Sequence, residues 1–435
     1  MPFTRPGTAG TVAVWLCAIA VLLAGCGGSA STSAAAGSGA PGTGASRAAS
    51  GTWRVADSGT RQPLYAVACL SVLRCEAVGA AGTILSTADG GVTWRAQANP
   101  LQGSPKILYR IACVAPSSCY VIARPDIVLV THDGGATWGG HVLPLAGGGA
   151  NLTDQACLAG NEPELRARPA LCRLGLLDVA CVSARVCYAA ATAPQAYEGA
   201  SGPPPAAASP PSAIWMTSDG GASWARQSVP PGVTCTLGDC GNLLYPYPLV
   251  WISCLSDGLC RAGGGDFLGC GHCGYAYAVL ASAGPGAPWR VVPCPGPAPG
   301  GGCATSFSPD AGDCPTSARC YGVYSTSPFD PGTSVWLSAD GGAAWQAVPS
   351  GSGSIRNDLA CPAARTCYTV GDHGTITSTA NGTAFVADSS PTARNLYGIT
   401  CADATACYAV GDDGTVLARM MLAMSIAFSD RTESQ

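Results

Sequence analysis

Seven pairs of cysteines with one common spacing divide this chain into repeats. Five residues separate the cysteines of each pair, and apolar residues precede the first, as in Val67-Ala68-Cys69. A run typical of a β-strand follows the second, as in Cys407-Tyr408-Ala409-Val410. Such regularity indicates repeated structural units. The pairs are Cys69/Cys75, Cys113/Cys119, Cys181/Cys187, Cys254/Cys260, Cys314/Cys320, Cys361/Cys367 and Cys401/Cys407.

A second motif, Asp-Gly-Gly followed by a tryptophan, recurs within the repeats. Asp-Gly-Gly between two β-rich runs predicts a tight hairpin turn, because glycine adopts positive φ at little cost. The carboxylate can accept hydrogen bonds from downstream amides, and the large tryptophan is expected to pack between neighbouring sheets. We therefore interpret the motif as structural, not as a metal site or an acid catalyst. Its copies contain Asp89 and Trp94, Asp133 and Trp138, Asp219 and Trp224, and Asp340 and Trp345.

This motif resembles the Asp box of BNR repeats, which occur in sialidases and many other β-propellers. Repeats with Val-Gly-x-x-Gly-Thr before such a turn, as in Val78 to Thr83, also resemble the photosystem II stability/assembly factor family. The resemblance covers about residues 52–419, with large departures in the third to fifth repeats. It implies a seven-bladed propeller that binds and chaperones protein partners without catalysis.

Each repeat can be divided into four strands, A to D. In the first repeat we expect strand A at Leu64–Cys69, B at Cys75–Gly79, C at Gly82–Thr87 and D at Val92–Gln97. Seven such units predict an all-β fold, a seven-bladed β-propeller of four-stranded antiparallel blades. Each cysteine pair joins strands A and B, and so small a closed loop stabilises the fold by at most about 2 kcal/mol.

The last repeat lacks a strand after residues 414–419, whereas Gly51-Thr52-Trp53-Arg54-Val55 resembles strand D of the first repeat. We therefore expect the N-terminal segment to complete the seventh blade and close the ring. The propeller spans residues 51–419, and the tail 420–435 fits no repeat.

The first 25 residues carry one charge, Arg5, and an apolar run from Val12 to Leu23, followed by Ala24-Gly25-Cys26. This segment resembles a bacterial lipoprotein signal peptide, which implies lipidation at Cys26. The apolar run is too short for a durable transmembrane helix. Residues 26–50 are rich in Gly, Ser and Ala, which predicts a flexible tether. We expect a protein anchored to the outer leaflet of the bacterial cell membrane.

The charge pattern argues against nucleic-acid binding. The whole chain has 22 basic and 26 acidic residues, and its single lysine is Lys106. The 58 glycines and 34 prolines suit a turn-rich β-protein. Cysteines behind an export signal indicate disulfides. We expect no cofactor, no metal and a monomer.

Repeats three to five carry most of the extra length. Insertions fall in D–A connections (Ala146–Gly175, Val229–Pro248, Pro293–Asp313) and in B–C loops (Ala191–Ser212, Gly263–Cys273, Ser325–Thr333). Both loop classes lie on one face of a propeller, so we predict that this face binds the partner. Four further cysteine sets, Cys157/Cys172, Cys235/Cys240, Cys270/Cys273 and Cys294/Cys303, lie in these insertions. The candidate binding residues are Tyr197, Glu198, Tyr245, Tyr247, Asp266, Phe267, His272, Phe329 and Asp330.

Catalytic interpretations have weaker support. Cys270-Gly271-His272-Cys273 is similar to the protein disulfide isomerase motif, but no βαβ pattern surrounds it. Arg124-Pro125 resembles the Arg-Ile-Pro motif of sialidases only weakly, because the isoleucine is missing. The expected function is therefore a non-catalytic scaffold that binds a protein or a glycan. The alternative is a cell-surface glycoside hydrolase, sialidase-like or with two carboxylates drawn from Glu198, Asp239, Asp266 and Asp330.

Overall fold

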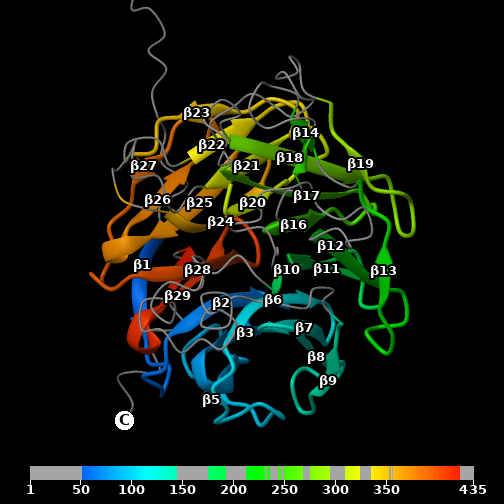
Figure 1. Cartoon of the computed structure of the whole chain (residues 1–435). Helices are drawn as coiled ribbons and strands as arrows, with labels where there is room; N and C mark the ends of the chain where they lie inside the picture. Colours follow the sequence, from blue (N-terminus) through cyan, green and yellow to red (C-terminus); the bar gives the residue numbers. More distant parts are fainter. Residues whose placement is uncertain are drawn as a thin grey trace, which may run out of the picture. The chain divides into compact units, whose positions relative to one another are not determined.

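The fold is a seven-bladed β-propeller, as predicted. The computed structural model describes residues 51–144, 175–192, 212–230, 233–235, 243–245, 249–267, 275–293, 309–323, 335–351, 354 and 356–421. Within them the chain forms seven four-stranded antiparallel sheets in a ring (Figure 1). A two-stranded hairpin forms a further sheet that is separate from the blades, and the described residues contain no α-helix.

The strands follow one order in every blade, from inner strand A to outer strand D. They are β2 Leu64–Cys69, β3 Cys75–Gly79, β4 Ile84–Thr87 and β5 Arg95–Ala96 in blade 1; β6 Leu108–Val114, β7 Ser118–Ala123, β8 Ile127–Thr131 and β9 Gly139–Val142 in blade 2; β10 Gly175–Cys181, β11 Cys187–Thr192, β12 Ser212–Thr217 and β13 Ala225–Gln227 in blade 3; β16 Trp251–Cys254, β17 Cys260–Phe267, β18 Tyr275–Ser282 and β19 Arg290–Val291 in blade 4; β20 Ala311–Asp313, β21 Cys320–Val323, β22 Val335–Ser338 and β23 Gln346–Val348 in blade 5; β24 Arg356–Ala363, β25 Thr366–Gly371, β26 Ile376–Thr379 and β27 Val386–Ala387 in blade 6; β28 Leu396–Cys401, β29 Ala406–Gly411, β30 Val416–Met421 and β1 Gly51–Ala56 in blade 7. The hairpin is β14 Val233–Cys235 with β15 Leu243–Tyr245, and single 3-10 turns occupy Ala80–Gly82, Asp372–Gly374 and Asp412–Gly414.

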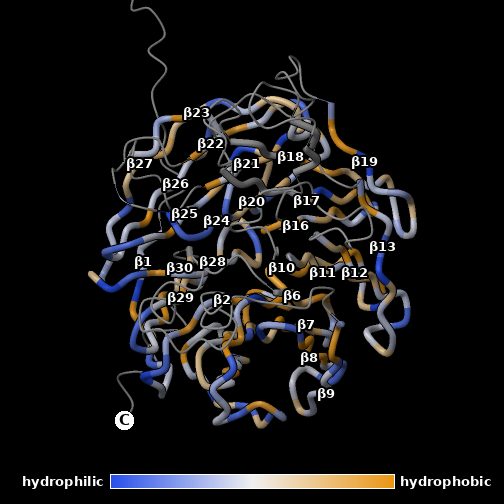
Figure 2. The backbone as a smooth tube through the Cα atoms, viewed as in Figure 1, coloured by the Kyte–Doolittle hydropathy of each residue, from blue (hydrophilic) through white to orange (hydrophobic). Residues whose placement is uncertain are grey.

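The hydrophobic core lies at the seams between blades. Leu64 and Ala77 of blade 1 pack with Val410 and Leu85 beside Trp94, for example, and each is almost fully buried. The hydrophobic stretches follow the strands, as β6, β7 and β10–β12 show clearly (Figure 2). Because each blade contacts only its two neighbours, the seams hold the ring together.

The N-terminal strand closes the ring, as expected. β1 pairs with β30 along its whole length, from Gly51 opposite Met421 to Ala56 opposite Val416. Trp53 on β1 is 6% exposed and meets Tyr368 of blade 6 edge-to-face, with ring centroids 6.4 Å apart.

Three strands differ in their bounds from those predicted. Strand C of blade 1 begins at Ile84 instead of Gly82, because Ala80–Gly82 form a 3-10 turn. Strand D of blade 1 is only Arg95–Ala96, because Val92 to Trp94 belong to the Asp-box turn. Strand C of blade 7 continues to Met421, since β1 provides a pairing partner two residues beyond the predicted end.

The seven predicted disulfides are present, and each closes the A–B turn of its blade. Their Cα atoms lie 3.9–4.1 Å apart, and the bonds are Cys69–Cys75, Cys113–Cys119, Cys181–Cys187, Cys254–Cys260, Cys314–Cys320, Cys361–Cys367 and Cys401–Cys407. In blade 2, for instance, Cys113 and Cys119 stand directly opposite each other across β6 and β7.

The disulfides depart from the predicted picture in two respects. In blade 6 the register between β24 and β25 shifts between Ala360 and Ala363, so Cys361 and Cys367 bridge an irregular part of the ladder instead of a regular pair. Moreover, the two cysteines of most bonds differ in burial, because the second one points into a seam, whereas in blade 5 both Cys314 and Cys320 are buried. Cys119 and Cys367, for example, are 0% exposed and belong to apolar clusters, whereas Cys113 and Cys361 are only partly buried. These second cysteines are therefore also core residues and unavailable as ligands for a partner.

The connections sort onto two faces. On the face that we call the Asp-box face, C–D turns meet A–B turns: the Gly90 amide donates to the Leu73 carbonyl at 3.0 Å. On the opposite face, which we call the insertion face, B–C turns meet D–A connections. There the Gly82 amide donates to the Lys106 carbonyl at 3.0 Å. Gly82 has a φ of +66°, and a Cβ at this position would clash with the Leu101 carbonyl.

Candidate binding face

The Asp-box carboxylates are occupied by their own turns. Asp133 Oδ1 accepts from the Thr131 hydroxyl at 2.8 Å and from the Thr137 amide at 2.9 Å, and Oδ2 accepts from the Thr137 hydroxyl at 2.6 Å. These bonds lower the pKa of Asp133 to about 2. Asp89 and Asp219 accept the equivalent hydrogen bonds in their own turns. Asp340 accepts from the Ser338 hydroxyl and the Ala344 amide, and since Ala344 has no hydroxyl, the third bond is lost. These contacts within the turns favour a structural role for the Asp-box carboxylates.

The tryptophans of these boxes lie between blades. Trp94, Trp138 and Trp345 are 7–8% exposed, and each belongs to an apolar cluster shared with the preceding blade. Trp224 packs at the seam between blades 2 and 3, with its ring centroid 6.3 Å from that of Tyr120. The Asp-box face is thus built from self-contained turns.

The insertion face is raised at blade 4. β17 and β18 each have eight residues and remain paired up to Phe267 opposite Tyr275. The predicted B–C loop Gly263–Cys273 was therefore wrong in part, because Gly263 to Phe267 continue the strand. The predicted D–A connection Val229–Pro248 also differs, since the β14–β15 hairpin forms inside it.

Three of the nine predicted binding residues lie on these ordered strands. Asp266 and Phe267 occupy the end of β17, opposite Ala276 and Tyr275, and Tyr245 ends β15. The other six, Tyr197, Glu198, Tyr247, His272, Phe329 and Asp330, lie outside the described residues, as do Cys26 and the hydrolase candidate Asp239. The insertion cysteines also fall outside the residues whose side chains are described.

Tyrosines cluster near the axis at the insertion-face end of the inner strands. The rings of Tyr65 and Tyr397 lie 5.6 Å apart, and Tyr109 joins them in one buried cluster. The Arg124 guanidinium lies 3.8 Å from the centre of the Tyr109 ring. The Tyr397 hydroxyl donates to Asp412 at 2.8 Å, and the pKa of Tyr397 is raised by burial and by this bond. The three tyrosines are at most 7% exposed, which favours a packing role.

Charged side chains line the inner strands below this cluster. Arg110 Nε lies 3.9 Å from Asp178 Oδ1, and both side chains are less than one fifth exposed. Burial raises the pKa of Asp178 to about 6 and also raises those of Asp313 and Asp358. Burial alone would lower the pKa of Arg110, but Tyr109 and the carboxylates of Asp358 and Asp178 raise that pKa overall.

These carboxylates fasten neighbouring blades to each other. Asp178 accepts from the Ile252 amide of the next blade at 2.9 Å. Asp313 accepts from the Cys361 amide at 2.9 Å, and Asp358 from the Ile399 amide at 3.1 Å. Since their oxygens are committed to backbone amides, the geometry favours a structural role over acid–base catalysis.

The part of the chain that the structure describes contains no group of His, Cys, Asp and Glu that could hold a metal ion. Nor do the described ranges include a helix long and apolar enough to cross a membrane.

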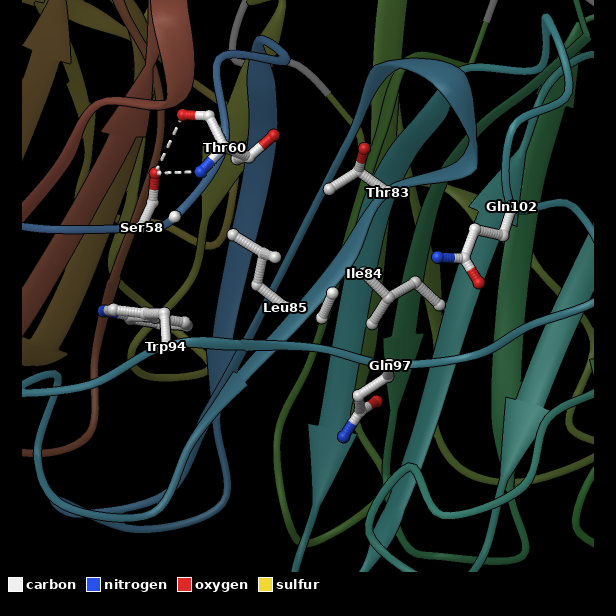
Figure 3. A pocket seen from close by; sticks show the side chains of 10 residues that line it. Ser58, Thr60, Thr83, Ile84, Leu85, Trp94, Gln97 and Gln102 are labelled. Atoms are coloured by element: carbon white, nitrogen blue, oxygen red, sulfur yellow. Dashed lines mark hydrogen bonds between the residues drawn. The ribbon is translucent and has the colours of Figure 1, made fainter.

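A hollow of about 240 Å³ lies at the outer side of the seam between blades 7 and 1. Figure 3 shows Ser58 and Thr60 of the ring-closing connection on one side and Trp94 and Gln97 of blade 1 below. The Ser58 hydroxyl donates to the Thr60 carbonyl and accepts from the Thr60 amide, so the polar groups of this wall bond to each other. The hollow is small for a drug-sized ligand, for which pockets of about 300–1,000 Å³ are typical.

Sequence reasoning missed the inner-strand residues Arg110, Asp178 and Asp358. All three stand three residues before the first cysteine of their repeats, so aligning the repeats would have exposed them as charges at an inner-strand position. Asp313 stands one residue before its cysteine and breaks that pattern.

Comparisons with known proteins agree with this architecture. A family model described as photosynthesis system II assembly factor YCF48 matches residues 45–149, less than half of the chain. No curated protein matches the chain significantly.

Three solved structures share the fold. YCF48 bound to D1 peptide is 14% identical, with a TM-score of 0.55, over 88% of this chain and 99% of that one. YCF48 from Cyanidioschyzon merolae is 17% identical, with a TM-score of 0.55, over 84% and 98%. Virginiamycin B lyase from Staphylococcus aureus is 8% identical, with a TM-score of 0.51, over 86% and 100%. Because an assembly factor and a lyase share this architecture, the fold alone does not decide between binding and catalysis. The chain is a seven-bladed β-propeller similar to the YCF48 assembly factors.

Proposed function

We propose that this chain is an exported, lipid-anchored propeller that binds a protein partner on its insertion face without catalysis. The proposal rests on one observation. The connections between strands vary in length on the insertion face, whereas on the Asp-box face disulfides close the A–B turns and the C–D turns form their own internal hydrogen bonds. In blade 4 the extra length is organised by backbone pairing in β17, β18 and the β14–β15 hairpin. Elements paired in this way lose less conformational entropy on binding than unpaired loops do.

A protein partner is favoured over a glycan by the similarity to YCF48, one structure of which holds a D1 peptide. An extended peptide can pair with a strand edge or lie along a raised rim, and the projecting ends of β17 and β18 offer such a rim. The lipid anchor rests on Cys26 and the signal-like segment before it.

The test removes the raised strands without touching the seams. Residues 265–277 are replaced by Gly-Asp-Asp-Gly-Thr, the turn that joins the paired Val410 and Val416 in blade 7. The variant and the parent are then applied to peptide and glycan arrays. We expect cooperative thermal unfolding close to that of the parent and a loss of affinity for peptides of roughly 30-fold, the effect of one hot spot of about 2 kcal/mol.

The matched control is Arg185→Ser, an exposed residue in an A–B turn of the Asp-box face, which should bind like the parent. Product release from any glycan by the parent would overturn the non-catalytic assignment. Equal affinity of parent and turn variant would overturn the assignment of the blade 4 rim.

A further inference from the structure

The ring-closing strand β1 has the longest outer edge among the described blades. It has six residues, Gly51–Ala56, and all six pair with β30. The outer strands of the other six blades, β5, β9, β13, β19, β23 and β27, have only two to four residues. Within the described residues β1 pairs with β30 alone, so its second edge presents a row of backbone N–H and C=O groups without a strand partner at the outer side of blade 7 (Figure 1).

The side chains along this edge differ between the two sides of the sheet. Arg54 is exposed, stands opposite the small side chain of Ala418, and forms no ion pair within the described part of the chain. Val55 points to the other side, next to Trp53, and is 62% exposed, one of four large apolar side chains that are exposed among the described residues. The edge therefore offers a positive charge on one side and an apolar contact on the other.

An edge of this length can accept a further strand from another molecule. Residues that stand directly opposite each other in an antiparallel pair point to the same side, with Cβ atoms about 4.5–5.5 Å apart. An acidic residue is therefore favoured opposite Arg54, and β-branched residues are favoured opposite Trp53 and Val55. The same rule disfavours a basic residue opposite Arg54, so the edge selects its partner by charge as well as by shape.

We propose that the outer edge of β1 binds an extended segment of a partner protein in which acidic and β-branched residues alternate. The segment adds a fifth strand to blade 7, antiparallel to β1 because antiparallel pairing is the more stable kind. This interaction surface lies on the outer side of one blade and does not depend on the function proposed for the insertion face.

Two other blades carry the same arginine without the same edge. Arg95 and Arg290 each follow the tryptophan of their blade and are exposed, as Arg54 is. Their strands β5 and β19 have only two residues each, which is too short for a ladder with a partner. Arg95 is therefore a matched control, since it has the chemistry of Arg54 but lacks the long edge.

The test exchanges the charge on the protein and on the ligand. Fluorescence polarisation measures the binding of two labelled peptides, Val-Glu-Val-Glu-Val-Glu and Val-Lys-Val-Lys-Val-Lys, to the whole chain. We expect the parent to prefer the acidic peptide and Arg54→Glu to prefer the basic one, each by about tenfold, because an opposite-charge pair is exchanged for a like-charge pair. Arg95→Glu should bind like the parent. The proposal is wrong if the parent binds both peptides equally or if Arg54→Glu keeps the preference for the acidic one.

Two further arms test the backbone pairing and the identity of the occupant. Acidic peptides with N-methyl groups on either set of alternate residues lose the amide donors of one edge, so one of the two should bind and the other should not. Equal binding of both would contradict strand addition. A parent dimer that Arg54→Glu dissociates and the acidic peptide does not would assign the edge to a second copy of the chain and overturn the proposal.

A last control separates this site from the blade 4 rim. The variant in which a short turn replaces residues 265–277 should bind the acidic peptide like the parent, because β1 lies in another blade. Loss of this peptide in that variant would place its site on blade 4 instead of on β1.

Discussion

Five blade seams are built around a tyrosine and two are not. In these five seams the tyrosine that follows the second cysteine meets an aromatic residue of the next blade, which lies in its C–D segment or on its strand D. Tyr408 meets Trp94 edge-to-face with centroids 6.4 Å apart, and its hydroxyl donates to the Val72 carbonyl at 2.8 Å. Tyr120 repeats this arrangement with Trp224 and the Ala184 carbonyl. Tyr408, Tyr120 and Tyr321 thus both fill their seams and donate to the next A–B turn. The Tyr368 hydroxyl instead accepts from Arg419, and the Tyr188 hydroxyl has no partner within the described residues.

The seam between blades 1 and 2 has Glu76 in that position. The Gln97 amide donates to Glu76 Oε1 at 3.4 Å, and the Trp138 indole donates to Gln97 Oε1 at 3.1 Å. Glu76 Oε2 has no hydrogen-bond partner within the described residues. Burial therefore raises the pKa of Glu76 to about 8, despite the opposing effects of Gln97 and Arg74.

The seam between blades 4 and 5 has Arg261 instead. Its guanidinium donates to the Gly341 carbonyl at 3.1 Å and to the Ser317 carbonyl at 3.3 Å. An arginine thus keeps the donor role of the tyrosine, whereas an ionised glutamate cannot donate at all. The comparison teaches that the position often supplies a donor to the next A–B turn, and that Glu76 could supply one only while protonated.

The largest effect is expected at a tyrosine seam. Tyr408→Ala removes a fully buried ring and should lower the free energy of unfolding by about 3–5 kcal/mol. Tyr408→Phe keeps the ring and loses the bond to Val72, which should cost about 1 kcal/mol. Urea denaturation of both variants measures the two contributions. Equal losses would show that the hydroxyl, and not the ring, dominates the seam.

The next effect depends on pH and belongs to the Glu76 seam. The folded state holds the proton up to about pH 8, whereas an unfolded glutamate loses it near pH 4.5. The stabilisation is therefore fully present below pH 4.5 and is lost as the pH rises toward 8. At roughly 1.4 kcal/mol per pKa unit, the loss is a few kcal/mol.

Glu76→Gln should remove this part of the pH dependence. Denaturation of variant and parent between about pH 4 and pH 9 isolates it, because buried Asp178, Asp313 and Asp358 affect both proteins equally. A difference between the two proteins that stays constant across the range would contradict the assignment to Glu76.

The blades were predictable because each repeat carries local markers. Cysteines five residues apart can bridge only across one tight turn, and the glycines of the Asp box specify the next turn. The rim of blade 4 was not predictable, since Gly263 to Gly265 have low β-propensity and only the pairing with Tyr277 to Val279 makes them a strand. Likewise, the bond from the Ile252 amide to Asp178 joins residues 74 positions apart, and no local pattern reports it.

The smallest effect is expected on the Asp-box face. Asp133→Asn keeps an acceptor for the Thr137 amide but weakens the bond from the Thr137 hydroxyl, and blade 6 already carries Asn381 at this place. The pKa of Asp133 is lowered to about 2, so its stabilisation is present above pH 3.8 and is lost as the pH falls through 2. The variant should therefore melt slightly below the parent at neutral pH and together with it near pH 2. Thr137→Ala, which removes the hydroxyl alone, should behave in the same way. Loss of partner binding in Asp133→Asn at neutral pH, with melting unchanged, would instead place a functional site on this face and reverse the contrast between the two sides of the propeller.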